Sequence, residues 1–388
     1  MAWKETNVME ERQSFITEFL KSKEPFNQLC AEYGISEKTG HKWKKRFIQY
    51  GISGLEDESR RPKSCPSQLS EDVTIRILNL REAHPYWGAK KLEELYKRAH
   101  GEAEAPSVSS INRVLEKAGK LKKRTVRRIG ADPHRLRQKI QANEPNDVWT
   151  VDFKGWWVSN HEKCLPLTIR DLASKNLFDI RLMQSTSSKA VRSVFTSLFY
   201  KYGLPKVIRS DNGTPFASHN GLLGLTDLSC WWLSLGIIPD RTDLGSPGQN
   251  GSHERMHADI SREIQGNVKG GIRENQIALD LWRKEYNEIR PNEAIGMKTP
   301  SEVYVPSPRK YYGDPEIIEY PLGFYPRKVN KDGYVRYSSI QIYISGALRG
   351  LTIGLQPRSD SKCLVWLAEF PLGLLNTSTF AFSPDLDV

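Results

Sequence analysis

Three short acidic segments constrain this chain more than any other feature of its sequence. They are residues 149–153 (WTVDF), 208–213 (IRSDNG) and 250–257 (NGSHERMH). The first two have the apolar character of strands and carry an aspartate at the strand end, Asp152 or Asp211. The third reads as a glycine-containing loop that runs into a helix carrying Glu254. If the fold brings these three elements together, the acids form one site; if it does not, they are three separate acids.

A site built from three carboxylates suits a hard divalent cation. Magnesium prefers oxygen ligands and keeps open positions for water and substrate phosphate. Two such ions, about 3.5–4 Å apart, activate one oxygen of a phosphodiester displacement and stabilise the leaving oxygen. Taken alone, the three acids fit such a site and ordinary surface positions equally well, because the chain has 46 acidic residues.

The same segments carry a family resemblance. Residues 250–257 match the Asn-Gly-x-His-Glu-Arg-Met-His motif of bacterial insertion-sequence transposases, and residues 210–216 and 286–294 agree with them as well. The chain therefore resembles the integrase-core (rve, DDE) transposases of the ribonuclease-H-like superfamily. The resemblance implies that the catalytic residues and metal ligands are Asp152, Asp211 and Glu254, with Asp152 bridging both ions.

Composition favours a DNA partner. Basic residues outnumber acidic ones by 57 to 46, giving a formal net charge of +11, and such a surplus indicates a polyanionic partner. No apolar run approaches the ~18 residues of a membrane span, and the first residues have no signal-peptide apolar region. The five cysteines are scattered and odd in number, so we expect reduced thiols. These features predict a cytoplasmic, nucleoid-associated bacterial protein without a membrane partner.

Residues 1–60 are predicted to form a helix-turn-helix DNA-binding domain. Apolar residues recur at helical spacing up to Tyr33, Gly34 supplies a turn, and Ser36 is placed to cap a cationic helix. A recognition helix has this character, with cations facing phosphates. The candidate DNA contacts on it are Lys38, Lys42, Lys44, Lys45 and Arg46. The alternative is an amphipathic helix with a solvated basic face.

Residues 67–125 are expected to form a second helix-turn-helix domain, for which a plain helical spacer is the alternative. Its predicted helices are 71–83, 89–100 and 109–118. A basic linker, residues 126–146, follows. The dense group of cations around its start is predicted to lie along a DNA backbone. Each phosphate that they neutralise makes the slope of log affinity against log salt concentration steeper by about 0.9. They are Lys122, Lys123, Arg124, Arg127 and Arg128.

The central domain, residues 147–305, is predicted to be a ribonuclease-H-like α/β fold, a mixed sheet with helices on both faces. The predicted strands are 148–153, 165–171, 178–182, 206–210 and 236–238, and the predicted helices are 187–202, 254–268 and 274–289. Asp152 and Asp211 fall at strand ends, where ligands gather in such sheets. Asp171 also ends a strand, and we assign it a surface role.

The loop before Glu254 is expected to order on DNA and to bring that glutamate to the metal ions. Residues 245–251 are rich in glycine and nearly uncharged. The DNA contacts predicted around the glutamate are Asn250, His253, Arg255 and His257. For the two histidines, helix packing is an alternative, and zinc ligation is the least favoured one.

Residues 320–380 are predicted to form a small β-barrel, which the resemblance makes SH3-like. Short runs of β-branched and aromatic residues alternate with glycine turns. These runs are 325–329, 334–337, 340–344, 351–355 and 363–367, and fraying is expected beyond residue 376. In integrase-like enzymes a domain in this place helps to bind DNA or to assemble subunits, and a purely structural role is the alternative.

Together these features predict a multidomain DNA transposase with N-terminal all-α modules, a central α/β core and a C-terminal β-barrel. The resemblance implies two Mg²⁺ per site, with Mn²⁺ as a substitute, 3′-end cleavage at terminal inverted repeats, and strand transfer into target DNA. Pairing two transposon ends requires a homo-oligomer, at least a dimer, on double-stranded DNA. The alternatives are a non-catalytic transposase-derived DNA-binding repressor and a metal-dependent DNA nuclease.

Overall fold

The computed structural model describes residues 7–21, 23–58, 69–121, 140–218, 221–242, 251–315 and 317–385. The chain divides into two compact units, Met1–Gln68 and Leu69–Val388. Several predicted DNA contacts lie outside the described residues, namely Lys122, Lys123, Arg124, Arg127, Arg128 and Asn250.

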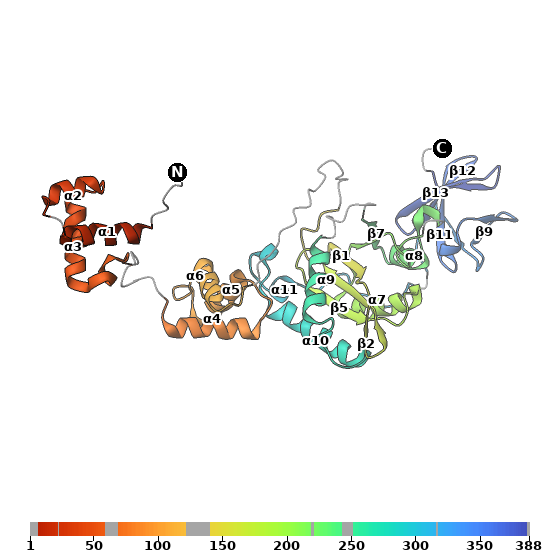
Figure 1. Cartoon of the computed structure of the whole chain (residues 1–388). Helices are drawn as coiled ribbons and strands as arrows, with labels where there is room; N and C mark the ends of the chain where they lie inside the picture. Colours follow the sequence, from red (N-terminus) through yellow and green to blue (C-terminus); the bar gives the residue numbers. More distant parts are fainter. Residues whose placement is uncertain are drawn as a thin grey trace. The chain divides into compact units, whose positions relative to one another are not determined.

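The first unit is a bundle of three helices (Figure 1). They are α1 (Val8–Lys21), α2 (Phe26–Glu32) and α3 (Glu37–Tyr50), followed by the 3₁₀ turn η1 (Gly51–Leu55). Ser36 begins α3 as predicted, because its hydroxyl accepts a hydrogen bond from the Thr39 amide at 3.2 Å. The helices pack through a buried cluster that includes Phe15, Leu29 and Trp43. This arrangement confirms the predicted helix-turn-helix architecture.

Three further helices open the second unit. They are α4 (Glu71–Ala83), α5 (Ala89–His100) and α6 (Val108–Lys117). Ser70 caps α4 and Ser107 caps α6, each by accepting a backbone N–H three residues ahead. The third helix was predicted to begin at Ser109, but it begins one residue earlier, at Val108, because Ser107 caps it. Trp87, Leu92 and Ile111 are among the residues buried between the helices.

These three helices contact α10 (Ile272–Glu288) and the residues that follow it through a row of polar side-chain pairs. Arg98 pairs with Glu302 at 3.1 Å, and Lys90 pairs with Glu293 at 3.0 Å. His84 Nδ1 lies 2.9 Å from Glu285 Oε1. Exposed pairs of this kind contribute little individually, but together they fix which face of α4–α6 meets the core.

The core is a five-stranded sheet in the order β5-β4-β1-β6-β7. The strands are β1 (Val148–Phe153), β4 (Pro166–Asp171), β5 (Leu177–Leu182), β6 (Val207–Ser210) and β7 (Ile238–Arg241). β1 pairs antiparallel with β4 and parallel with β6, and β6 pairs parallel with β7. The predicted mixed sheet is confirmed.

Helices cover both faces of this sheet, as predicted (Figure 1). One face packs against α7 (Ser188–Tyr202) and α8 (Asp227–Ser234), and the other packs against α9 (Gly251–Glu263) and α10 (Ile272–Glu288). A hairpin of β2 (Trp157–Ser159) and β3 (Glu162–Cys164) contributes to the second face. α8 was not predicted, because its continuous apolar run has no amphipathic period to distinguish it from a strand.

α8 has no polar side because it is buried on two sides. Trp231 and Trp232 belong to the core cluster under the sheet, whereas Cys230 and Leu233 belong to the apolar cluster of the C-terminal strands. A single helix therefore serves two hydrophobic cores, and the C-terminal strands pack onto the catalytic core through it.

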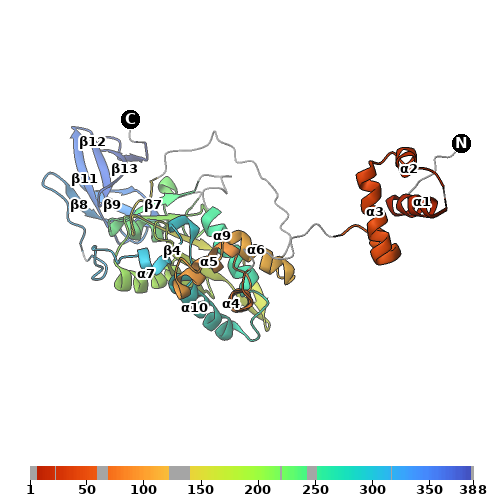
Figure 2. The same ribbon diagram turned by 90° about the vertical axis from the view of Figure 1, so that its left-hand side faces the viewer.

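The C-terminal region forms two antiparallel sheets. β8 (Tyr325–Lys328), β11 (Thr352–Ser359), β12 (Lys362–Leu367), β13 (Phe370–Asn376) and β14 (Ala381–Ser383) make one sheet in the order β14-β13-β12-β11-β8. β9 (Tyr334–Tyr337) and β10 (Ile340–Tyr343) make a separate hairpin. Figure 2 shows these strands together as one small domain. Between residues 317 and 385, no strand pairing closes the two sheets into a barrel.

Two expectations about the C-terminal strands were wrong. β13 was not predicted, because its leucines surround Pro371 and Gly373, which read as turn signals. The chain also does not fray beyond residue 376, since β14 pairs with β13 from Asn376 to Leu374. β13 and β14 form a local hairpin, which was missed because its first strand was not predicted.

Two compositional expectations have structural counterparts. Cys30, Cys164, Cys230 and Cys363 are buried free thiols, and the fifth cysteine lies outside the described residues. In the described part of the chain, no helix combines the length and the apolar character needed to cross a membrane.

Candidate active site

Sheet pairing brings the two predicted aspartates together. Asp152 lies near the end of β1, and Asp211 directly follows β6, the parallel neighbour of β1. The register pairs Thr150 with Arg209, so continuing it by two residues sets Asp152 level with Asp211. Gly213 gives Asp211 room to turn, because a Cβ there would lie 3.0 Å from its Oδ2 atom. The Gly213 amide also donates to Asp211 Oδ1 at 3.1 Å.

Glu254 comes from the first turn of α9, whose inner face packs on the sheet. Met256, Ile260 and Ile264 bury that face, and Glu254 itself is exposed. The loop expected to deliver the glutamate on DNA binding spans residues that are largely outside the described part of the chain, so that expectation stays a prediction.

The pKa of Asp152 reports the proximity of the three acids. Burial, together with the charges of Asp211 and Glu254, raises the pKa of Asp152 to about 7. Like charges held together oppose ionisation of the most buried member. A divalent cation would relieve this repulsion, and carboxylate oxygens, one partly buried and two exposed, are the donors that such a cation prefers.

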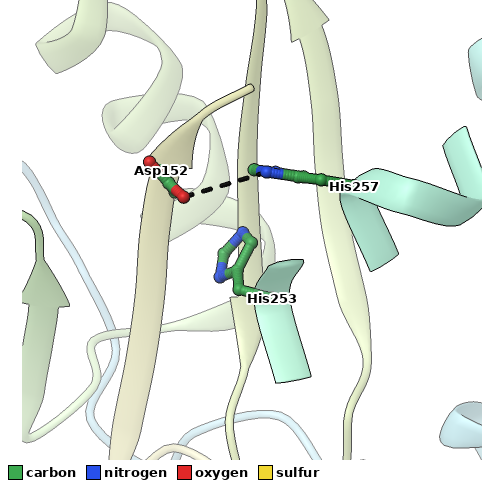
Figure 3. A group of neighbouring side chains, drawn as sticks. All are labelled: Asp152, His253 and His257. Atoms are coloured by element: carbon green, nitrogen blue, oxygen red, sulfur yellow. Dashed lines mark ion pairs between the residues drawn. The ribbon is translucent and has the colours of Figure 1, made fainter. Parts of the chain in front are cut away.

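Two histidines flank Glu254 and point from α9 towards β1 (Figure 3). His253 is 1% exposed, and its Nδ1 and Nε2 atoms lie 3.1 and 2.7 Å from the Thr150 and Thr168 hydroxyls. Its burial fits helix packing, which was the alternative to the predicted DNA contact. His257 Nε2 lies 2.8 Å from the same Thr168 hydroxyl, and its Nδ1 lies 3.8 Å from Asp152 Oδ2.

Burial and nearby cations keep both imidazoles neutral. Desolvation lowers the pKa of His253 well below its ordinary value, and the charge of Arg170 acts in the same direction. The pKa of His257 falls to about 3 because of burial and the charges of Lys154 and Arg170. Asp152, His253 and His257 offer ligand atoms within 4.8 Å of one another, a grouping that the DDE pattern does not predict.

An ion-pair network holds α9 in place. Arg290 Nη2 lies 2.5 Å from Asp259 Oδ2, and its Nη1 lies 3.5 Å from Glu263 Oε1. Trp282 on α10 donates its ring N–H to Glu263 at 2.7 Å. Arg290 is buried, so it positions the helix that carries Glu254 without being exposed to DNA.

The prediction of a surface role for Asp171 was wrong. Its side chain is fully buried, and its Oδ1 accepts the Asn146 amide at 2.7 Å while its Oδ2 accepts the amide and hydroxyl of Ser174. Asp171 therefore organises the loop between β4 and β5. A strand-end position gave no sign of this, because the burial comes from segments distant in sequence.

Several important side chains were missed from sequence. Thr168 lies directly opposite Asp152 across the β1–β4 ladder, and Thr150 precedes Asp152 by two residues on the same face. In the sequence, the one sign that these threonines matter is a polar residue inside a strand that is otherwise apolar. Lys154 is also buried near the site and donates to Gln265 at 3.0 Å.

The predicted contacts on α3 differ in their availability to DNA. Lys38, Lys42 and Lys45 are exposed. Lys44 lies 4.2 Å from the centre of the Phe19 ring. Arg46 donates to the Glu56 carbonyl at 2.7 Å and pairs with Glu58 at 3.4 Å. The exposed lysines are thus the freest of the set to meet phosphate, and Arg255 beside Glu254 is exposed as well.

Family models match four regions of the chain. An integrase core domain matches residues 142–247, and a second integrase core domain model matches residues 235–300. A helix-turn-helix domain matches residues 11–63, and a homeodomain-like domain matches residues 39–115.

Curated relatives come from bacterial insertion elements. The chain is 27% identical over 255 residues to an uncharacterized 39.2 kDa protein of insertion element IS476 from Xanthomonas euvesicatoria, covering 65% of this chain and 70% of that protein. It is 26% identical over 238 residues to an uncharacterized 31.7 kDa protein of IS407 from Burkholderia multivorans, covering 61% of this chain and 82% of that protein. The integrase core and helix-turn-helix matches and the insertion-element relatives together support a bacterial insertion-sequence transposase of the integrase superfamily. This transposase is accordingly a polynucleotidyl transferase that carries helix-turn-helix domains for DNA.

Solved structures similar to the transposase include retroviral proteins. One is the HTLV-2 integrase catalytic core domain in complex with magnesium, which is 16% identical, with 42% of this chain and 100% of that chain covered and a TM-score of 0.31. Another is the simian T-cell lymphotropic virus intasome in complex with a PP2A regulatory subunit, which is 14% identical, with 76% and 97% covered and a TM-score of 0.35.

Proposed function

We propose that this transposase cuts the 3′ ends of its element and joins them to target DNA at a site formed by Asp152, Asp211 and Glu254. The observation that carries the proposal is the raised pKa of Asp152, to which both other acids contribute. Two carboxylates whose charges disfavour ionisation of a third, partly buried one create a site that favours a bound cation. Ordinary surface acids have no such mutual effect, because solvent screens them.

Divalent ions, Mg²⁺ with Mn²⁺ as a substitute, supply activation of the attacking oxygen and neutralisation of the leaving oxygen when two are bound. We propose that Asp152 contacts both ions, with Asp211 completing one site and Glu254 the other. The protein's own part is to fix the donors. β1 and β6 are hydrogen-bonded neighbours, so the two aspartates are held side by side, and Arg290 fixes the helix that carries Glu254.

DNA recognition is assigned to the helical modules. We propose that α3 contacts the terminal inverted repeats, and that Arg255 and the cations at residues 122–128 contact DNA close to the site. Residues 1–60 and 67–125 would then be the two DNA-binding domains, 126–146 the linker and 147–305 the catalytic core. The barrel-like domain at 320–380 would help to hold DNA or a second subunit, since pairing two ends requires at least a dimer.

The experiment is a cleavage and joining assay on the full chain. The substrate is labelled duplex from the DNA flanking the gene, with Mg²⁺ or Mn²⁺, and the variants are Asp211→Asn and Asp332→Asn. Asp332 is an exposed acid remote in sequence from the site, so its variant controls for loss of one negative charge.

Metal-dependent cutting with joining, lost in Asp211→Asn and kept in Asp332→Asn, is the expected result. Loss of one preorganised stabilising group lowers the rate by a factor of about 10²–10³. Cutting without joining would favour a nuclease. Sequence-specific binding with no chemistry in any variant would favour a repressor and overturn the proposal.

A further inference from the structure

One hydroxyl fixes the hydrogen-bonding state of both active-site histidines. Thr168 Oγ1 donates to the backbone carbonyl of Asp152 at 3.0 Å. The same oxygen lies 2.7 Å from His253 Nε2 and 2.8 Å from His257 Nε2. A hydroxyl has one hydrogen and two acceptor sites. Because a carbonyl oxygen can only accept, we assign the hydroxyl hydrogen to it, and both Nε2 atoms are then assigned as donors to the threonine oxygen.

This assignment leaves the other nitrogen of each ring as an acceptor. A neutral imidazole carries one N–H and one lone pair. His253 directs its Nδ1 lone pair at the Thr150 hydroxyl, 3.1 Å away, which satisfies it. His257 directs its Nδ1 lone pair at the Asp152 carboxylate, where the nearest oxygen lies at 3.8 Å (Figure 3). Two electron-rich atoms therefore face each other at the metal-binding carboxylate.

In a metal-binding histidine, one ring nitrogen usually binds the metal and the other donates a hydrogen bond to a fixed acceptor. The second hydrogen bond selects the tautomer and orients the ring. Here the orienting group is Thr168, which is itself held by the backbone of Asp152. The ring, the hydroxyl and the backbone of Asp152 thus belong to one hydrogen-bonded unit across the β1–β4 ladder.

We propose that His257 Nδ1 is a ligand, together with Asp152, for a first-row transition-metal ion such as Mn²⁺ at the active site. The inference rests on the proposed function in placing an ion at Asp152, and it adds a nitrogen donor to the carboxylates. Imidazole nitrogen favours transition ions, whereas Mg²⁺ favours oxygen. The site therefore discriminates between Mn²⁺ and Mg²⁺ in a way that three carboxylates would not.

The geometry is close to that of a chelate. Bonds of about 2.0–2.2 Å from one ion set two ligand atoms ~3.0–3.5 Å apart. The observed separation of 3.8 Å is a few tenths of an ångström longer than that range.

His253 does not share this role. It is the more buried ring, and both its nitrogens are already within hydrogen-bond distance of threonine hydroxyls. Ligation by His253 would break one of those bonds in a buried setting, which carries a desolvation penalty. Of the two histidines in the motif, His253 therefore packs the helix onto the sheet and His257 is the ligand.

The test is electron spin-echo envelope modulation of Mn²⁺ bound to the full-length protein without DNA. Nitrogen bonded to Mn²⁺ modulates the echo, and carboxylate oxygen does not. The samples are wild type, wild type labelled with ¹⁵N-histidine, His257→Gln and Asp152→Asn, with Arg255→Gln as the control on the same helix. Circular dichroism checks folding, and titrations give the dissociation constants for Mn²⁺ and Mg²⁺.

We expect nitrogen modulation in wild type that changes to the ¹⁵N pattern with labelled histidine and disappears in His257→Gln. The Mn²⁺ dissociation constant should rise roughly tenfold or more in that variant, since even outer-shell partners of a metal are worth about 10–100-fold. Affinity for Mg²⁺ should change much less. Asp152→Asn should weaken Mn²⁺ binding, and Arg255→Gln should leave the nitrogen signal intact.

Three outcomes overturn the proposal. They are Mn²⁺ binding to wild type without nitrogen modulation, modulation that persists in His257→Gln, and Mn²⁺ affinity unaffected by Asp152→Asn. The first is read from wild type alone, so it holds even when a variant misfolds. A normal nitrogen signal in a protein that fails to cut or join DNA would count against the proposed function and not against ligation by His257.

Discussion

At the scale of single residues, the burial of an acid in the active site lowers the stability of the folded protein. Asp152 is largely buried beside two other acids, and its pKa is about 7 in the metal-free protein. The unfolded chain ionises an aspartate near pH 4. As pH rises from about 4 to 7, the unfolded state loses this proton first, so the folded state becomes less stable.

Replacing that carboxyl with an amide should therefore stabilise the metal-free protein. Between a pKa of about 7 and an ordinary value near 4, the difference is at most about 4 kcal/mol. Asp152→Asn should raise the melting temperature in EDTA by at least about 2 °C at pH 8, and by almost nothing at pH 4. Calorimetry of both proteins and of Asp332→Asn measures this, and an equal gain at both pH values would contradict it.

At the scale of elements, α3 illustrates how packing divides a run of like charges. Lys45 is exposed, whereas Arg46 is committed to Glu56 and Glu58 at the end of the first unit. Lys45→Ala should reduce the salt slope of terminal-repeat binding by about 0.9, the share of one phosphate contact. Arg46→Ala should mainly lower the melting temperature of the unit.

Fluorescence anisotropy with the full chain at several salt concentrations gives the two slopes. If Arg46→Ala flattened the slope as much as Lys45→Ala does, the guanidinium would belong to the DNA interface, and its contacts with the two glutamates would be secondary.

A second element, α9, depends on one buried arginine for its position. Arg290 neutralises Asp259 and Glu263 on that helix, and removing one partner of a buried ion pair costs about 3–5 kcal/mol. Arg290→Gln should increase hydrogen exchange of residues 251–263 and lower transposition activity, although the residue does not touch the three acids. Lys284→Ala, an exposed position on α10, is the control. Unchanged exchange in α9 would contradict the anchoring role.

At the scale of the whole molecule, DNA recognition and chemistry are divided between compact units. Met1–Gln68 and Leu69–Val388 have separate hydrophobic clusters. Deleting residues 1–68 should therefore leave the thermal transition of the remainder in place, while preference for the terminal repeats over unrelated duplex falls at least about tenfold. Calorimetry and competition binding measure the two effects. Retained preference would assign sequence recognition to α4–α6.

The sequence by itself determined the parts whose information is local. Ser36 and Ser70 mark helix starts because a hydroxyl satisfies backbone donors three residues ahead, and alternating apolar runs mark β1 and β6. The motif around Glu254 was sufficient to indicate the family, and with it the three acids. Each of these signals lies within a few residues of the feature it predicts.

Tertiary structure alone decided what depends on residues far apart in the chain. The burial of Asp171 and the two-sided burial of α8 both come from distant segments. The same holds for the two histidines of the motif, which are alike in sequence context. Thr168 contacts both rings, and only the partner of Nδ1 distinguishes them: Thr150 for His253 and the Asp152 carboxylate for His257. Hydrogen-bond partners, not residue types, set which nitrogen has a free lone pair, and the fold chooses those partners.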